Sequence, residues 1–248
     1  MDEREIKVKV RNLTKCFGDL KVLDDISFDV KKGDFLCIVG PTGCGKTTFL
    51  NSLTRIYDIT AGEILVNDEP VNLKKHNIAY ILQEYSTMPW LTVEQNIAYG
   101  LKIKKAPKKL VQERVEKFMG MVGLEKYRNY YPKELSASML QRVNIARAFA
   151  VEPELLLMDE PYGQLDIELR FALEDELLKL WKATGTTVIF ITHNIEEAVY
   201  LGERILVLTN KPTKIKEEII NDLPHPRDIS SPGFVELRNR VTDLIKWW

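Results

Sequence analysis

Residues 35–48 form an apolar run that breaks into a glycine-rich loop and read Phe35-Leu36-Cys37-Ile38-Val39-Gly40-Pro41-Thr42-Gly43-Cys44-Gly45-Lys46-Thr47-Thr48. The five leading apolar residues are typical of a buried strand, and residues 49–53 continue with the apolar spacing of a helix. The residues that match every fixed position of the pattern G-x-x-x-x-G-K-[ST] are Gly40, Gly45, Lys46 and Thr47. This order of strand, loop and helix predicts a phosphate-binding loop.

The residue types of this loop suit phosphate chemistry. Glycines lack a Cβ atom, so successive backbone N–H groups can turn toward phosphate oxygens, and the following helix adds the positive end of its dipole. We expect Lys46 to reach the β- and γ-phosphates of a nucleotide, and the hydroxyl of Thr47 to bind Mg²⁺. A glycine-rich turn that contains a lysine by chance would lack the flanking strand and helix. The predicted nucleotide contacts are Gly40, Pro41, Thr42, Gly43, Cys44, Gly45, Lys46, Thr47 and Thr48.

The composition is that of an ordinary globular protein. Of its 248 residues, 45% are hydrophobic, which supports a substantial core. Lys and Arg (35) balance Asp and Glu (36) to a formal net charge of -1, so no positive excess points to nucleic acid. An odd number of cysteines, Cys16, Cys37 and Cys44, indicates free thiols in a reducing, cytosolic compartment. No apolar run approaches the ~20 residues of a membrane-spanning helix, so we expect any tie to a membrane to come through a partner.

Alternation of apolar and polar residues predicts strands in the first third of the chain, at residues 6–30, 62–68 and 77–82. We expect these strands to form a small antiparallel sheet beside the core that carries the phosphate-binding loop. Helical spacing then predicts an inserted helical region with helices at residues 92–104, 108–122 and 139–151.

Continuous apolar runs return after this insert. Residues 154–158 and 187–191 fit parallel strands buried on both faces, with a long amphipathic helix between them at about residues 165–183. Residues 205–208 and 215–220 predict two further strands.

The last segment predicts a C-terminal helix that starts at Ser231 and Pro232. Its apolar stripe consists of Phe234, Leu237, Val241, Leu244, Ile245 and Trp248. We expect this stripe to pack on its own domain, with a contact to another subunit as the alternative.

Two adjacent carboxylates, Asp159 and Glu160, end the apolar run that starts at residue 155. Ligands of an open parallel sheet bind at the carboxyl ends of its strands, where this pair would lie. Asp159 suits a water-mediated contact to Mg²⁺, and Glu160 would then orient or deprotonate an attacking water. Two acids in a solvated loop are the plainer interpretation, but the apolar run and the phosphate-binding loop favour the catalytic one.

Taken in order, these motifs resemble the ATPase subunit of an ATP-binding cassette (ABC) transporter, and the resemblance covers nearly the whole chain. It implies an α/β P-loop NTPase fold: a core with a mixed or parallel sheet, an antiparallel β subdomain and an inserted α-helical subdomain. The implied cofactors are ATP and Mg²⁺. The implied boundaries are residues 1–86 and 154–220 for the core with its β subdomain, 87–153 for the helical subdomain and 221–248 for a C-terminal helical tail.

The resemblance also implies roles for residues outside the phosphate-binding loop. Phe17 matches the aromatic residue that stacks on adenine, and Asp166 matches the D-loop aspartate at the nucleotide. Gln83 matches the glutamine that links the nucleotide to the permease. His193 matches the switch histidine, which contacts the γ-phosphate and holds the attacking water. The implied catalytic residues are Glu160, His193, Lys46 and Gln83. The implied metal ligands are Thr47, Gln83 and Asp159.

The family signature, usually Leu-Ser-Gly-Gly-Gln, corresponds here to Leu135-Ser136-Ala137-Ser138-Met139, so both glycines are replaced. Ser136 starts an apolar-faced helix, where its hydroxyl suits either a helix cap or a γ-phosphate bound in trans to another subunit. The intact Gln141-Arg142 that follows favours a modified signature over a lost one.

Two stretches resemble the importers of nitrate, sulfonate, taurine and related compounds, namely residues 83–93 and Leu223-Pro224-His225-Pro226-Arg227. This implies an ATP-hydrolysing importer subunit at the cytoplasmic face of the cell membrane. The implied partners are a second copy or a homologous ATPase subunit in a head-to-tail dimer, transmembrane permease subunits and, indirectly, an extracytoplasmic solute-binding protein, with no nucleic acid.

Two competing hypotheses stay open. Soluble ABC ATPases of translation or DNA repair typically carry two cassettes or a long coiled-coil insertion, and this chain shows neither. A regulatory, low-activity partner in a heterodimer is disfavoured by Glu160 and His193 but favoured by Ala137 and Ser138.

Overall fold

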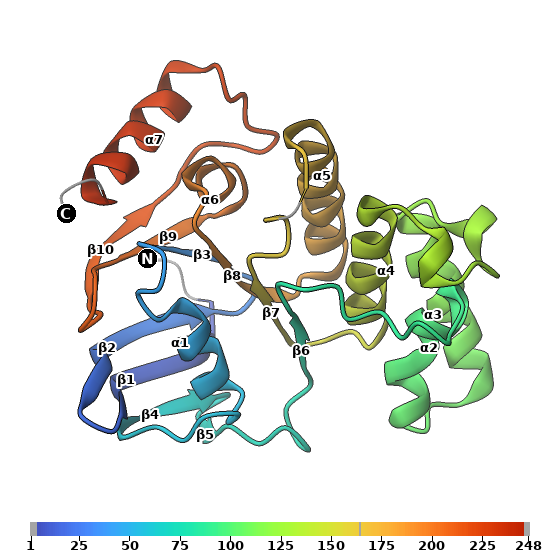
Figure 1. Cartoon of the computed structure of the whole chain (residues 1–248), viewed down its shortest axis with the longest axis horizontal. Coiled ribbons are helices and arrows are strands. Elements are labelled where there is room, and N and C mark those ends of the chain that lie inside the picture. The colour runs from blue at the N-terminus through green and yellow to red at the C-terminus, as the bar shows by residue number, and fades with distance from the viewer. Residues whose placement is uncertain (1–3, 164, 246–248) are drawn as a thin grey trace. The chain divides into compact units, whose positions relative to one another are not determined.

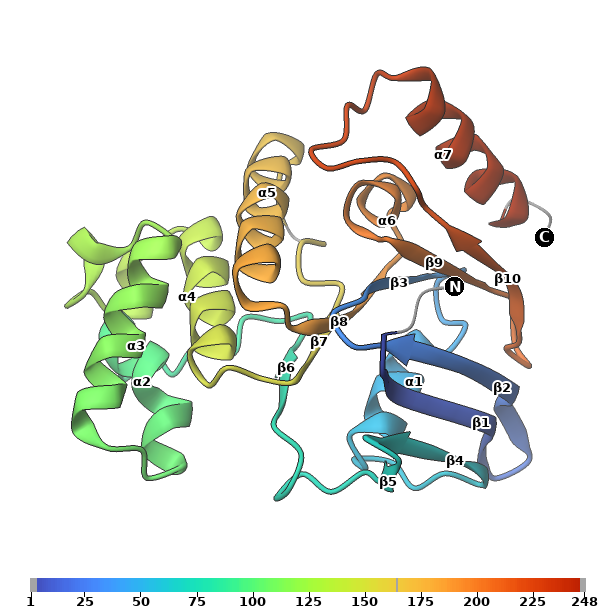
Figure 2. The ribbon, with the colours of Figure 1, turned by 180° about the vertical axis from the view of Figure 1, so that it is seen from behind.

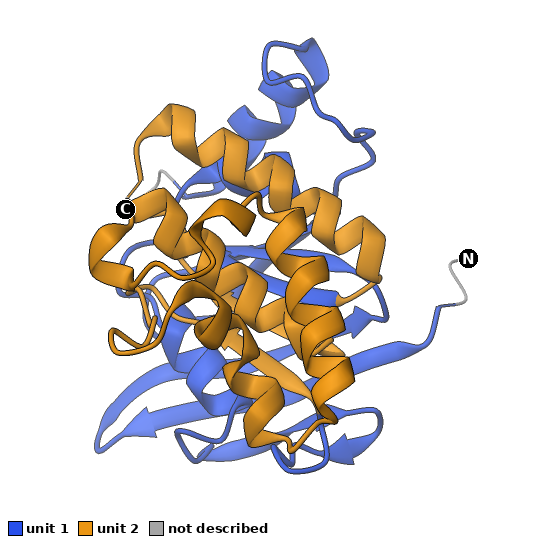
Figure 3. Cartoon of the chain, turned by 90° about the vertical axis from the view of Figure 1, so that its right-hand side faces the viewer, with its two compact units in different colours: residues 1–76, 187–248 blue, residues 77–186 orange. Residues whose placement is uncertain are grey.

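The computed structural model describes residues 4–163 and 165–245. They form two compact units, one built from residues 4–76 and 187–245 and the other from the described part of residues 77–186 (Figure 3). The predicted helical insert, residues 87–153, lies entirely within the second unit. Within these described ranges, no helix has the length and apolar character needed to cross a membrane.

The first unit begins with a four-stranded antiparallel sheet of order β2-β1-β4-β5 (Figure 1). Apolar side chains such as Val8, Val10 and Val30 fill its buried face. The pairing confirms the antiparallel strands predicted for residues 6–30 and 62–68. The four strands are β1 (Ile6–Phe17), β2 (Leu20–Lys31), β4 (Ala61–Val66) and β5 (Glu69–Pro70).

The phosphate-binding loop follows β3 (Phe35–Val39), a strand with neighbours on both sides in the first unit. β3 lies parallel to β8 (Thr187–Thr192) and β9 (Arg204–Leu208), and β10 (Ile215–Ile220) pairs antiparallel with β9. Every residue of β3 and β8 is buried, as their continuous apolar runs predict. The helices of this unit are α1 (Lys46–Leu53), α6 (Ile195–Leu201) and α7 (Pro232–Ile245).

The second unit combines a parallel strand pair with a helical region. β6 (Ile78–Ile81) lies parallel to β7 (Leu155–Asp159). The buried rings of Phe118 and Phe149 stack with centroids 6.3 Å apart and join α3 to α4. The three helices predicted for the insert are confirmed to within two residues at each end. The helices are α2 (Val93–Ile103), α3 (Lys108–Met121), α4 (Ala137–Ala150) and α5 (Ile167–Thr184), with 3₁₀ turns at Glu125–Tyr127 and Pro132–Glu134.

The prediction that residues 77–82 join the antiparallel sheet is wrong. β6 instead pairs with β7 in parallel, from Ile78 opposite Leu155 to Ile81 opposite Met158. Burial alternates along β6 because it is an edge strand with α4 packed against it. Alternation of this kind resembles the pattern of a half-exposed antiparallel strand.

The C-terminal helix α7 packs on its own unit, against α6 and β9, with Phe234 and Val241 buried (Figure 2). This confirms the expectation that the apolar stripe of the tail faces its own domain. The hydroxyl of Ser231 accepts a hydrogen bond from the backbone N–H of Phe234 and so caps the helix start as predicted. Trp248, the last residue of the predicted stripe, lies outside the described residues.

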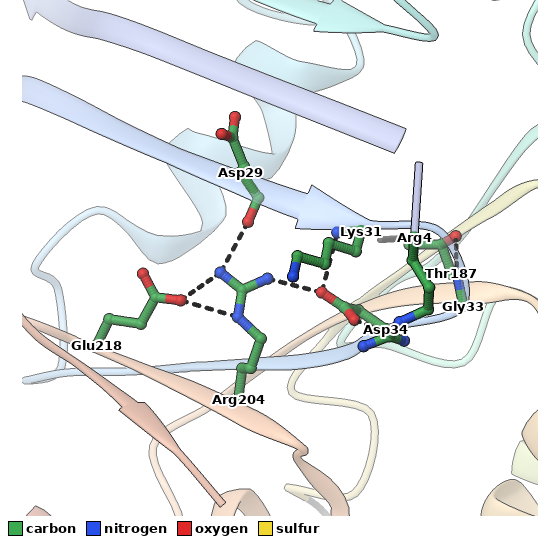
Figure 4. Close-up of polar contacts among 8 residues, drawn as sticks. All are labelled: Arg4, Asp29, Lys31, Gly33, Asp34, Thr187, Arg204 and Glu218. Carbon is green, nitrogen blue, oxygen red and sulfur yellow. Dashed lines mark hydrogen bonds and ion pairs between the residues drawn. The ribbon is translucent and has the colours of Figure 1, made fainter. Parts of the chain in front are cut away.

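A buried ion-pair cluster joins several strands of the first unit (Figure 4). The carboxylate of Asp34 has no exposed area and contacts the guanidinium of Arg204 at 2.6 Å and that of Arg4 at 2.9 Å. Arg204 also pairs with Glu218 on β10 and donates to the backbone carbonyl of Asp29 on β2. One arginine therefore ties β2 and the turn before β3 to β9 and β10.

We expect Arg204→Met to lower the free energy of unfolding by about 3 kcal/mol, because the Asp34 carboxylate stays buried with one partner fewer. Urea unfolding followed by tryptophan fluorescence measures this change. Arg240→Met is the matched control, since its ion pair with Glu217 is largely exposed, and it should cost less than ~1 kcal/mol. Equal losses for the two substitutions would contradict a special contribution from the buried pair.

Candidate functional site

The backbone of the phosphate-binding loop requires glycine at several positions. Gly43 and Gly45 have φ values of +75° and +117°, in the left-handed region that residues with a Cβ rarely adopt. A Cβ on Gly45 would lie 2.8 Å from Cγ1 of Val22, and one on Gly40 would lie 2.9 Å from Cβ of Leu208. Both backbone conformation and close packing therefore select glycine in this loop.

Lys46 begins α1 and turns its side chain back over the loop. Its Nζ donates to the carbonyl oxygens of Gly40 at 3.0 Å and Pro41 at 3.2 Å, and the residue is 5% exposed. The next residue, Thr47, is exposed. The ammonium group and the amino-terminal end of α1 thus lie at the same loop, an arrangement that favours a bound anion.

Sequence patterns give no signal for Thr213, which supports this loop. Its hydroxyl donates to the backbone carbonyl of Cys44, and its backbone N–H donates to the carbonyl of Val22 at 2.9 Å. Burial raises the pKa of the Cys44 thiol above its ordinary value, so the thiol stays protonated at neutral pH. Cys44 therefore contributes its backbone to the loop and not a reactive thiolate.

The register of the sheet brings His193 beside the loop. Val39 lies opposite Thr192 in the parallel pair of β3 and β8, so Gly40 and His193 leave the same edge as neighbours. His193 is exposed, and the hydroxyl of Thr192 before it donates to the buried carboxylate of Glu197 on α6 at 2.5 Å. The predicted loop and the predicted switch histidine therefore lie together in the first unit.

Phe17 ends β1 and exposes 43% of its surface. Its ring meets Tyr57 at an interplanar angle of 89°, with centroids 5.4 Å apart. The ammonium of Lys15 lies 4.5 Å from the Phe17 centroid and donates to the carbonyl of Asp58 at 2.6 Å. An exposed aromatic pair suits a flat purine ring. Sequence reasoning missed Tyr57 and Lys15, because neither belongs to a motif.

Three of the predicted site residues follow the parallel strands of the second unit. Asp159 is the last residue of β7 and is 4% exposed, and the hydroxyl of Tyr80 donates to its Oδ2 at 3.4 Å. The register of β6 and β7 brings Gln83 and Glu160 to this same edge, where Gln83 is exposed. Asp159 and Glu160 therefore come at the end of a buried strand as predicted, their chemical roles stay predictions, and no sequence pattern pointed to Tyr80.

Glu160 has a strained backbone conformation. Its φ of +45° lies in the left-handed region, which is uncommon for a residue with a Cβ. The backbone N–H of Gly163 donates to the Glu160 carbonyl at 3.2 Å and closes a tight turn. Among the described residues several others with a Cβ also have a positive φ, so the conformation alone does not mark a site; here it sets the direction in which the chain leaves β7.

The oxygen atoms of the predicted metal ligands suit Mg²⁺ better than a transition metal. A hydroxyl, an amide and a carboxylate, from Thr47, Gln83 and Asp159, are hard ligands. Within residues 4–163 and 165–245, no group of three or more His, Cys, Asp or Glu side chains is placed to hold a metal ion. Mg²⁺ usually keeps several waters and binds the phosphates of a nucleotide, so it needs few protein ligands, and its binding by these three residues stays a prediction.

Ser136 caps the signature helix α4. Its hydroxyl accepts a hydrogen bond from the backbone N–H of Met139 at 3.3 Å and lies 3.1 Å from the hydroxyl of Ser138. Ala137 and Ser138 lie in the first turn of α4, so their backbone does not require glycine. The capping interpretation of Ser136 is confirmed, and its contact in trans stays a prediction.

Asp166 immediately precedes α5, with an extended backbone and an exposed side chain. Arg170 on the first turn of α5 donates to the carbonyl of Leu165 at 3.3 Å, across the turn that carries Asp166. The contact of Asp166 with a nucleotide stays a prediction.

A family model described as ABC transporter matches residues 23–163. Along 99% of its length the chain is 43% identical to an uncharacterised ABC transporter ATP-binding protein of Methanocaldococcus jannaschii, of which it covers 93%. It is 41% identical to the aliphatic sulfonates import ATP-binding protein SsuB of Bacillus cereus, with 97% of this chain and 96% of the relative covered.

A solved ABC cassette has the same fold. The dimeric structure of a post-hydrolysis state of the ATP-binding cassette MJ0796, bound to ADP and Pi, matches with a TM-score of 0.74 and 30% identity. The match covers 86% of this chain and 98% of that one. The chain therefore belongs to the ABC transporter family, as its phosphate-binding loop, its mixed sheet and these relatives show, and it is an ATP-binding ATPase of that family.

Proposed function

We propose that this chain is the ATP-hydrolysing subunit of an importer for a small sulfonate-like solute. The observation that carries the proposal is the 41% identity to the aliphatic sulfonates import ATP-binding protein of Bacillus cereus along 97% of this chain. The match extends along nearly all of the importer subunit, of which 96% is covered, and no long coiled-coil insertion interrupts it. The importer function is therefore preferred over translation or DNA repair.

The working unit is a head-to-tail dimer at the cytoplasmic face of the membrane, beneath permease subunits that receive solute from an extracytoplasmic binding protein. Two copies, or one copy and a homologous subunit, enclose two MgATP between the phosphate-binding loop of one subunit and the Ser136 region of the other. The dimeric state of the related cassette supports this arrangement.

The phosphate-binding loop holds the nucleotide. Backbone N–H groups of residues 42–48 and the ammonium of Lys46 surround the β- and γ-phosphates, and Phe17 stacks on the base. Thr47, Gln83 and Asp159 would hold Mg²⁺, which would neutralise phosphate charge. The contacts of Lys46 with the loop carbonyls support this assignment, because they keep the ammonium close to the amide groups of the loop.

Hydrolysis depends on groups that act on the attacking water. Glu160 orients this water or accepts its proton, and His193 contacts the γ-phosphate and steadies the water. Gln83 links the site to the permease, and Asp166 contacts the nucleotide. The position of Glu160 directly after the carboxyl end of β7 and that of His193 beside Gly40 support these roles.

Replacing Glu160 by Gln is expected to lower the rate of ATP hydrolysis at least a hundredfold while ATP still binds, because the amide keeps the shape of the side chain but cannot accept a proton. Phosphate release measures hydrolysis, and size-exclusion chromatography with ATP should show a stabilised dimer. A rate close to that of the parent would remove Glu160 from the catalytic role.

Lys46→Ala is the matched comparison, because Lys46 is assigned to binding and not to the activation of water. It should weaken the affinity for a fluorescent ATP analogue at least tenfold, through loss of a charge-assisted contact. If Lys46→Ala binds as tightly as the parent, the phosphate-binding role of the loop lysine is wrong.

The solute assignment predicts a response of the assembled importer. In proteoliposomes that hold this subunit with its cognate permease, an alkanesulfonate and its binding protein should raise the ATPase rate several-fold over the solute-free rate. Nitrate and a sugar are the comparison solutes. Stimulation by the sugar and not by the sulfonate would overturn the solute class but leave the ATPase function intact.

The altered signature predicts a slower ATPase than the glycine-containing sequence would give. Side chains at Ala137 and Ser138 are expected to hold the subunits slightly apart, and loss of one charge-assisted hydrogen bond of ~1.5–3 kcal/mol would slow hydrolysis roughly ten- to a hundredfold. Ala137→Gly combined with Ser138→Gly should therefore raise the ATPase rate, and should strengthen ATP-dependent dimerisation when Glu160 is replaced by Gln. No change, or a fall, would instead indicate that the hydroxyl of Ser138, beside that of Ser136, replaces the glycine N–H contact.

A further inference from the structure

The helix that follows His193 is too short to be stable by itself. α6 has seven residues, Ile195–Leu201, and isolated helices of fewer than about 12 residues are marginal in water. Its amino-terminal end is held by Asn194, whose Oδ1 accepts from the backbone N–H groups of Glu196 at 2.8 Å and Glu197 at 3.3 Å. Its last five residues are buried against the rest of the unit, and the carbonyl groups of its last turn, at the carboxyl-terminal end, need hydrogen-bond partners from outside the helix.

That end is held by one buried arginine from the C-terminal segment. Nη1 of Arg227 donates to the carbonyl oxygens of Val199 at 2.9 Å, Tyr200 at 2.9 Å and Gly202 at 2.8 Å. Nδ2 of Asn221 donates to the carbonyls of Val199 and Gly202, both at 2.9 Å. The last carbonyls of a helix have no partner within the helix, so these two side chains supply what α6 lacks.

Arg227 is suited to this contact by its charge as well as by its shape. It is 6% exposed, and burial lowers its pKa to about 10, so it is still protonated at neutral pH. A guanidinium cation at the carboxyl-terminal end of a helix interacts favourably with the helix dipole. Nε also donates to the carbonyl of Leu223 at 3.0 Å, which fixes the guanidinium within its own segment.

We propose that Arg227, assisted by Asn221, is a positioning residue for His193. The backbone of His193 lies between the end of β8 and the start of α6, so a clamp on the far end of this short helix sets the direction in which the chain leaves His193. The inference rests on the proposed role of His193 at the γ-phosphate. It gives the C-terminal segment a part in hydrolysis although that segment does not touch the phosphate-binding loop in the proposed mechanism.

The test compares ATP hydrolysis and ATP binding in three variants. Arg227→Met should lower kcat about tenfold and leave the affinity for ATP within about twofold, because the phosphate-binding loop is unchanged. Arg227→Lys should recover part of the loss, since an ammonium also donates to carbonyls at a helix end. Arg238→Met is the matched control: it removes a half-buried ion pair between α7 and Glu196 on α6 but no contact to the last carbonyls of α6, and it should leave kcat unchanged.

A double-mutant cycle with His193→Ala separates this inference from the proposed function. If Arg227 acts through His193, Arg227→Met should lower kcat no further in the His193→Ala background. An additive loss, or an equal loss of kcat and ATP affinity, would overturn the positioning role. If His193→Ala itself leaves kcat unchanged, the proposed role of His193 fails as well. If Arg227→Met does not fold, Asn221→Ala takes its place in the test, because it removes contacts to two of the same carbonyl groups. The outcomes described above then support or overturn the positioning role in the same way.

Discussion

The path of the backbone at the carboxyl end of β3 is the constraint on which the other parts of the first unit depend. β3 lies between two parallel neighbours, so its carboxyl end opens beside theirs. Gly40 comes so close to Leu208 that even a methyl group would clash. The loop then continues through Gly43 and Gly45, in conformations that exclude most side chains, into the start of α1. As a result, backbone amides and one lysine form the loop, and this is the chemistry that phosphate requires.

Parallel register then determines which residues become neighbours of this loop. Because Val39 lies opposite Thr192, His193 leaves the sheet next to Gly40, although the two are far apart in the sequence. The same geometry in the second unit brings Gln83 to the edge where Asp159 and Glu160 leave β7. Each unit therefore carries its own part of the proposed chemistry at the carboxyl ends of parallel strands.

Much of the fold could be predicted from the sequence because the way in which a helix or strand is buried determines the spacing of its apolar residues. The continuous apolar runs of β3, β7 and β8 and the helical spacing of α2 to α4 are direct consequences of how those elements are covered. β6 shows the limit of this reasoning. The alternation of apolar and polar residues in β6 indicates that one face of the strand is more buried than the other. It does not indicate whether the partner strand runs parallel or antiparallel.

The site residues that sequence reasoning missed have a common physical character. Thr213, Tyr80 and Arg227 act through side-chain hydrogen bonds to backbone or carboxylate oxygens that lie far from them in the sequence. The spacing of apolar residues indicates which side chains are buried, and motifs indicate which residues contact a ligand. A side chain that only donates a hydrogen bond to another part of the protein is detected by neither. Arg227 shows why this matters: seven hydrophobic and polar residues of α6 predict a helix only weakly, and a charged residue 26 positions beyond its end supplies the contacts that its last turn lacks. The stability of a short element next to a catalytic residue can therefore be set by a segment that no local pattern connects to it.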